Sequence, residues 1–232
     1  MRLPLWSMGV WLLAAAALCL PGCTPEESQA RRQPPASQPA TVTSRPQVTS
    51  APTTTAASPW VVLFDGDDMR RWRTVQGNAK CENGAMILDG RRGDTTVIAR
   101  RLHLRNGTVE VELRRQPPDA NDGPYTVGLR LPARITWRSV YFVCRRESLE
   151  ACRASWLKRF PQPEKQVRLE RAPGRKLWRF VMNEGVIHCY RDGEKVLTYD
   201  DADPRTGTIG LTASRCRIEV RSIRYRPAAN GP

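Results

Sequence analysis

The sequence has few of the side chains on which most metal and acid–base chemistry depends. Only two histidines, His103 and His188, occur in 232 residues, and no carboxylate lies between Asp122 and Glu147. The short paired cysteine spacings of structural zinc sites are missing as well. These absences argue against a cysteine-bound metal and against paired catalytic carboxylates in that segment. We therefore predict no metal site and no cofactor.

A helical rhythm of apolar residues is also largely missing. The best helix candidate is residues 147–160, where apolar side chains keep a rough helical spacing before a proline. Elsewhere short runs alternate, as where Val109, Val111 and Leu113 are separated by charged residues. About ten such runs, separated by turns, predict an all-β fold of the jelly-roll β-sandwich type. The predicted domain covers residues 59–228.

Three dipeptides mark the tightest turns. Asn83-Gly84 is the strongest short signal for a hairpin, because both residue types accept a positive φ. Glu184-Gly185 and Asp192-Gly193 divide residues 176–199 into three segments. We expect these segments to form a three-stranded meander.

The N-terminus has the pattern of a secretory signal peptide, which we assign to residues 1–22. A short basic start precedes an apolar stretch of about a dozen residues, whereas a membrane-spanning helix needs roughly 20. Leu20-Pro21-Gly22-Cys23 resembles the lipobox of bacterial lipoproteins, which implies lipidation of Cys23. Thr24 replaces the aspartate that retains lipoproteins at the inner membrane, which favours the outer membrane or cell surface. Ordinary secretion after a nearby cleavage is the alternative.

Residues 23–58 follow as a segment rich in proline, serine and threonine, with almost no large apolar side chains. Such a composition cannot bury enough surface to offset the entropy of ordering the chain. We predict a disordered tether that holds the following domain away from a membrane.

Acidic residues are much fewer than basic ones. The chain carries 37 Lys and Arg against 23 Asp and Glu, a formal net charge of +14. This excess favours an anionic partner, although arginine spread along the whole domain is also what a GC-rich genome produces. No basic helix or recognition motif points to nucleic acid. The expected partner is a carbohydrate or another anionic polymer of the cell envelope, with the membrane reached through the lipid anchor only.

Five cysteines remain after Cys23, an odd number that leaves at least one thiol unpaired. They are Cys81, Cys144, Cys152, Cys189 and Cys216. Cys144 and Cys152 are the only close pair in the sequence. The disulfide pairing is left open.

Three stretches carry a resemblance to a known family: "WVVLFDGDDMRRW" (60–72), "KLWRFVMNEGVIHCYRDGEKV" (176–196) and "RTGTIGLTASRCRIEVRSIRYRP" (205–227). Together they resemble the bacterial 3-keto-disaccharide hydrolase family, the domain of unknown function 1080. The resemblance implies a concanavalin A-like jelly roll, related to laminin G-like sandwiches, whose concave sheet holds sugar. It also implies, as an alternative function, a hydrolase or lyase acting on 3-keto-glycosides.

The catalytic candidates under that alternative are weak. Counted back from Gly193, the family's histidine position falls on Cys189, and His188 lies one residue out of register. A shift of one residue on a strand points the side chain to the opposite face, so we expect no Cys–His pair. His188 and Arg130 remain as candidates, and the acidic Asp200, Asp201 and Asp203 are read first as part of a turn.

The function we favour from the sequence is glycan binding, with an acidic polysaccharide as the ligand. Aromatic faces stack on sugars, and arginines bind carboxylates or sulfates. The predicted ligand-binding residues are Asn121, Tyr125, Arg130, Trp137 and Tyr141, with Trp156 as a further candidate. Trp137 and Tyr141 have core positions as the alternative, and we expect Trp72 and Trp178 in the core.

Overall fold

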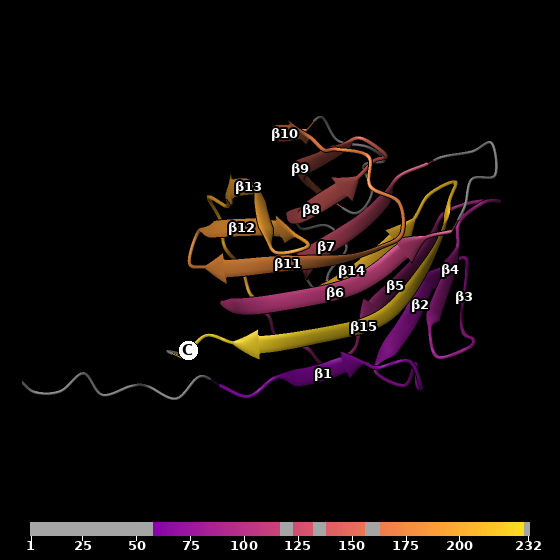
Figure 1. The fold of residues 1–232 in the computed structure, drawn as a ribbon. Coiled ribbons are helices and arrows are strands. Elements are labelled where there is room, and N and C mark those ends of the chain that lie inside the picture. Colours follow the sequence, from indigo (N-terminus) through magenta and orange to yellow (C-terminus); the bar gives the residue numbers. More distant parts are fainter. Residues whose placement is uncertain (1–57, 117–122, 132–137, 156–162, 230–232) are drawn as a thin grey trace, which may run out of the picture. The chain divides into compact units, whose positions relative to one another are not determined.

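The computed structural model describes residues 58–116, 123–131, 138–155 and 163–229. They lie within a compact unit that spans Pro52–Pro232. All regular elements in this described part are strands of two antiparallel sheets (Figure 1). Within it, no helix is long and apolar enough to cross a membrane. The predictions for Cys23, for the tether, and for Asn121, Trp137 and Trp156 fall outside the described residues.

The first sheet has eight strands. In spatial order it contains β13 (Glu194–Asp200), β12 (Val186–Arg191), β11 (Arg175–Asn183), β6 (Gly107–Arg115), β15 (Arg217–Pro227), β4 (Met86–Asp89) and β3 (Asn78–Cys81), and β1 (Val61–Phe64) also pairs with β15. The long strands β11, β6 and β15 lie side by side at its centre (Figure 1).

The second sheet has seven strands. Its order is β10 (Lys165–Arg168), β9 (Ser148–Ser155), β8 (Arg138–Cys144), β7 (Tyr125–Leu131), β14 (Thr208–Ala213), β5 (Thr95–Ala99) and β2 (Trp72–Gln76). Strands β7 to β10 are consecutive in the chain, whereas β14, from near the C-terminus, lies between β7 and β5.

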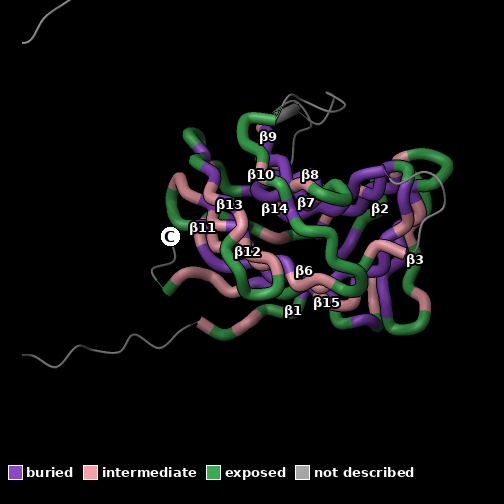
Figure 2. Tube along the Cα trace, turned by 45° about the horizontal axis from the view of Figure 1, so that its top comes forward, coloured by how far each residue is buried: buried purple, intermediate pink, exposed green. Residues whose placement is uncertain are grey.

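The core lies between the two sheets. Buried residues alternate with more exposed ones along β11, β12 and β13, whereas the central strands β6 and β7 are buried over most of their length (Figure 2). Phe142 of β8 and Phe180 of β11 meet across the interior with ring centroids 5.0 Å apart. Trp72 and Trp178 are both buried, which confirms their expected core positions. The all-β sandwich predicted from alternation is confirmed.

The predicted hairpins are also confirmed. Asn83 and Gly84 join β3 to β4 with φ of 52° and 66°, and Asp192 and Gly193 join β12 to β13 with φ of 54° and 92°. Glu184, with φ of 48°, begins the turn from β11 to β12. Residues that tolerate left-handed φ thus stand where each turn requires it.

The best helix candidate, residues 147–160, is not helical in the part that the structure describes. Residues 148–155 form β9, which pairs with β8 on one side and β10 on the other. Leu149 and Ala151 are buried on its inner face at a spacing of two residues. The apolar residues of this segment fit the spacing of a helix and that of a strand about equally well. It forms a strand because β8 and β10 supply backbone hydrogen bonds on both sides.

None of the five cysteines among the described residues is disulfide-bonded. Cys144 belongs to the core, whereas Cys152 lies outside that cluster and pairs across the strands with Tyr141. The two cysteines closest in sequence therefore face opposite sides of one sheet, and no disulfide forms among the described residues.

Candidate functional site

A cleft of about 390 Å³ opens at one end of the sandwich. Strands β6, β8 and β12 end there, while β7 and β11 begin there. Basic side chains dominate its wall: Arg114, Arg115, Arg145, Arg146, Arg171, Lys176 and Arg191, with Glu170 as the carboxylate. We call it the basic cleft.

The floor of the basic cleft is aromatic and apolar. Tyr125 and Trp178 lie there beside Leu113 and Leu169. The indole Nε1 of Trp178 donates a hydrogen bond to Tyr125 Oη at 2.8 Å, and the Arg115 guanidinium lies 5.4 Å from the centre of the Tyr125 ring. Burial raises the pKa of Tyr125 well above its ordinary value, so the phenol stays neutral.

Several cations in the wall are paired with carboxylates that lie outside the cleft. Arg145 Nε donates to Glu150 at 2.7 Å, and Lys176 Nζ lies 3.1 Å from Asp192. Arg114 is likewise paired with Glu219, at 2.5 Å. These pairs fix the positions of the side chains and offset part of their charge.

Arg171 and Arg191 differ from those paired cations. Arg191 Nη1 donates to the backbone carbonyl of Glu170 at 2.9 Å, which orients the guanidinium without neutralising it. Arg171 is exposed in the loop before β11 and pairs with no described side chain. Burial raises the pKa of the Cys144 thiol to about 12, and the positive charges of Arg115 and Arg191 oppose that rise. The charges of Arg171 and Arg191, unpaired among the described residues, give the cleft a positive potential suited to an anion.

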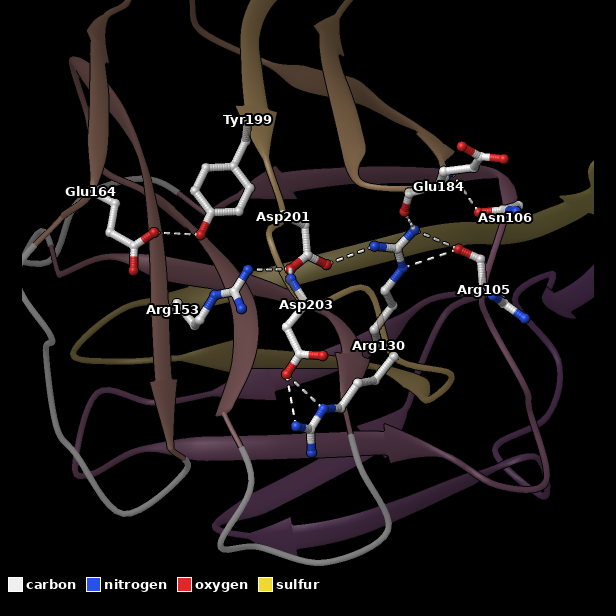
Figure 3. A network of polar contacts seen from close by, with 10 residues as sticks. Arg105, Asn106, Arg130, Arg153, Glu164, Glu184, Tyr199, Asp201 and Asp203 are labelled. Atoms are coloured by element: carbon white, nitrogen blue, oxygen red, sulfur yellow. Dashed lines mark hydrogen bonds and ion pairs between the residues drawn. The ribbon is translucent and has the colours of Figure 1, made fainter.

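Arg130 lies elsewhere, enclosed in the sandwich (Figure 3). Its side chain is 2% exposed and donates from Nη1 to Asp201 at 2.6 Å. Nε and Nη2 donate to the carbonyl of Arg105 at 3.0 and 2.6 Å, and Nη2 also donates to the carbonyl of Glu184 at 3.0 Å. With its donors used and no exposed surface, Arg130 has a structural role, and the sequence prediction of a ligand or catalytic contact finds no support in this placement.

Asp201 is the centre of the same network. It accepts hydrogen bonds from Arg130 and Arg153, while Tyr199 Oη donates to Glu164 at 2.5 Å beside them (Figure 3). Asp203 turns away to pair with Arg205 at 2.7 Å. The acidic cluster is thus divided between separate arginines, and within the described part of the chain no group of three His, Cys, Asp or Glu is placed to hold a metal ion.

His188 and Cys189 point to opposite faces of β12, as their register predicted. Cys189 is fully buried in the core, and His188 is half-buried on the outer face with Nδ1 3.0 Å from Thr198 Oγ1. A hydrogen bond between the two side chains is therefore ruled out by the strand itself.

The remaining predicted contacts are divided between the two sheets. Tyr125 lies in the floor of the basic cleft, but it is largely buried. Tyr141 is half-buried in the outer face of the seven-stranded sheet, next to Gly128, and burial raises its pKa to about 12. The structure therefore does not bring Tyr125, Arg130 and Tyr141 together. The prediction missed Arg171 and Arg191, for which the only sequence signal is a basic residue at a strand end or loop.

No family model matches the chain, and no curated protein matches it. Solved structures do. A carbohydrate-binding module, CBM66, from Bacillus subtilis has a TM-score of 0.58 at 11% identity, covering 66% of this chain and 94% of the module. The Crh5 transglycosylase in complex with NAG has a TM-score of 0.59 at 11% identity, covering 74% of this chain and 85% of the enzyme. Laminarinase from Flavobacterium sp. UMI-01 has a TM-score of 0.52 at 9% identity, covering 73% and 99%.

At such low identities these structures show the fold alone. The jelly roll that the family resemblance implied is confirmed. Membership of the 3-keto-disaccharide hydrolase family is not shown, because no family model supports it.

Proposed function

We propose that this chain is an exported, lipid-anchored envelope protein whose jelly-roll domain binds an acidic polysaccharide in the basic cleft. The observation that carries the proposal is the cleft itself, where Arg171 and Arg191 stand above an aromatic floor. The names of the similar structures, a carbohydrate-binding module and enzymes that act on glycans, support a carbohydrate as the ligand.

The basic wall of the cleft suits the acidic groups of such a ligand, and the aromatic floor suits its sugar rings. Guanidinium groups bind carboxylates or sulfates through charge-assisted and often bidentate hydrogen bonds. The apolar floor suits the C–H surface of a sugar ring, which packs on aromatic side chains. A volume of about 390 Å³ lies in the range of ligand clefts, so the site accommodates a short stretch of a longer polymer.

The location of the protein rests on the sequence. The signal pattern before Cys23 and the proline-rich segment after it favour a domain held on a tether from the outer membrane or cell surface. Acidic polysaccharides of the cell envelope are accessible from that position. Metabolic labelling with a fatty acid, lost on Cys23→Ser, is the direct check of the anchor.

The test of the cleft uses the full chain and two oligosaccharides of equal length, one of uronic acids and one neutral. We expect Arg171→Gln combined with Arg191→Gln to weaken uronate binding roughly ten-fold or more, because hydrogen bonds to charged groups are worth about 1.5–3 kcal/mol each. The charge-matched control is Arg73→Gln with Arg92→Gln, two exposed arginines with no partner among the described residues. Calorimetry measures the affinities.

Two results contradict the proposal. One is equal affinity for the neutral and the acidic oligosaccharide. The other is an equal loss in the cleft variant and in its control, since that loss would follow net charge alone. The single variant Arg171→Gln separates lost binding from lost folding. Its side chain is exposed and unpaired among the described residues, so we expect it to fold normally and still to bind the uronate more weakly.

Hydrolysis or elimination at a 3-keto-glycoside stays a prediction from the family resemblance. Its two candidate residues do not converge, since Arg130 is enclosed and His188 faces outward from the other sheet. No observation in the described residues favours it over binding.

A further inference from the structure

The outer face of the eight-stranded sheet carries a second concentration of positive charge, which shares only Arg114 with the basic cleft. We call it the arginine face and define it by the outward side chains of β11, β6 and β15. Its residues are Arg175, Arg179, Glu110, Glu112, Arg114, Glu219, Arg221, Arg224 and Arg226. Six arginines thus stand against three glutamates.

Strand register sets the arrangement of these charges. Glu110 of β6 lies opposite Arg179 on one side and Arg224 on the other, and accepts from both at 2.7 and 2.6 Å. Glu219 accepts from Arg114 at 2.8 Å and from Arg221 at 3.0 Å. Cross-strand neighbours lie about 5 Å apart, so the arginines of the three strands lie close to one another on this face.

The two signs of charge lie at different depths. The Glu110 and Glu219 side chains are only 3% and 5% exposed, whereas those of Arg179 and Arg224 are 43% and 48% exposed. The carboxylates of Glu110 and Glu219 are therefore covered by guanidiniums, whereas Glu112 is 37% exposed. With six arginines against one accessible carboxylate, a partner approaching from outside meets mainly positive charge. A guanidinium has five N–H donors, so one that is clamped by a carboxylate still has donors for a second anion.

The N-terminal end of the described chain lies on this face. Trp60 precedes β1, which pairs with β15, and its ring lies 4.5 Å from the Arg224 guanidinium and 4.9 Å from that of Arg226. β1 runs beside β15 (Figure 1), so the described chain begins at this face. A half-exposed tryptophan among arginines is a composition suited to a membrane–water interface.

We propose that the arginine face binds the anionic phosphates of a lipid bilayer. An extended sheet face presents its charges in one layer, which suits a bilayer surface better than a single glycan chain in a cleft. The phosphates accept hydrogen bonds from guanidiniums already oriented by Glu110 and Glu219. The membrane contact predicted from the sequence is the lipid anchor, and this face adds a second, electrostatic contact that does not use Arg171 or Arg191 of the basic cleft.

The test measures binding of the full chain to vesicles of phosphatidylcholine with and without phosphatidylglycerol. The ratio of the two affinities cancels any contribution of the apolar N-terminal segment. The face variant is Arg221→Gln combined with Arg226→Gln. In it Glu219 keeps its pairs with Arg114 and Arg175. Glu110 keeps its pairs with Arg179 and Arg224, so both carboxylates stay paired. We expect the ratio to fall roughly thirty-fold, about five-fold per arginine.

The charge-matched control, Arg73→Gln with Arg92→Gln, is expected to change the ratio less than two-fold. Equal losses in both variants, or no loss in the face variant, would overturn the proposal. So would loss of binding to soluble dextran sulfate in the face variant with an unchanged vesicle ratio, because the face would then bind a polymer. The Arg171→Gln/Arg191→Gln variant should keep the vesicle ratio while losing uronate binding, which separates this proposal from the cleft.

Discussion

Arg130 and Arg191 show that the same residue type serves opposite purposes at two positions. Arg130 gives its donors to one carboxylate and two backbone carbonyls inside the protein, so it fixes three segments of chain at once. Arg191 uses a single carbonyl as a support and directs its charge into a cleft. Sequence alone placed Arg130 among the ligand contacts, because the distant Asp201 that encloses it is visible only in the fold.

The enclosed pair leads to a prediction about stability. Asp201→Asn leaves the charge of Arg130 without its counter-ion in a buried position, and breaking a buried pair costs about 3–5 kcal/mol. Asp203→Asn, two residues away, removes an exposed pair with Arg205 and should cost less than about 1 kcal/mol. Urea unfolding of the two variants measures the difference. A similar loss of unfolding free energy in both variants would show that the buried pair of Arg130 and Asp201 does not stabilise the fold more than the exposed pair does.

Single strands and hairpins could be predicted well from the sequence, since their signals are local. The alternation of β12 follows from a period of two residues, and the Asn83-Gly84 and Asp192-Gly193 turns follow from the φ that those residues accept. β9 could not be predicted in this way, because the spacing of residues 148–155 fits a strand and a helix almost equally well, and only pairing with β8 and β10 distinguishes the two. Pairing with β8 and β10 on both sides decided that β9 is a strand.

The alternation of β12 can be tested at adjacent positions. Cys189→Ser places a hydroxyl in the core, which costs about 1–3 kcal/mol when no partner accepts its hydrogen bond. His188→Ser changes a half-exposed side chain on the outer face and should cost less than half as much. Thermal unfolding of the two variants compares them. Equal destabilisation would mean that the two side chains do not face opposite environments.

The basic cleft is formed by the fold as a whole and not by any one element. Its walls come from the end of β6, the turn after β8, the loop before β11 and the end of β12, segments separated by tens of residues. The composition predicted an anionic partner, and aromatic residues were expected in the site. The position of the cleft could not be predicted, because it depends on which strand ends the jelly roll brings to one end of the sandwich.

The excess of arginine also governs how the whole molecule responds to acid. The hydrogen bond from Arg91 lowers the pKa of Asp89 from 3.8 to about 2. For Glu219, burial acts to raise the pKa, but hydrogen bonds from Arg114 and Gln116 outweigh it and the pKa is lowered. A carboxylate with a lowered pKa in the folded state stabilises that state above its unfolded pKa, and the stabilisation disappears as the pH falls through the folded value.

We therefore expect the free energy of unfolding to fall between about pH 4 and about pH 2. Asp89→Asn should be less stable than the parent protein at neutral pH, and the gap should close across this window, because the parent carboxyl becomes neutral there. Arg91→Gln removes the partner instead and should flatten the profile in the same window. Urea midpoints measured from neutral to acidic pH provide the test. A gap that stays constant down to pH 2 would show that the ion pair with Arg91 does not stabilise the folded state.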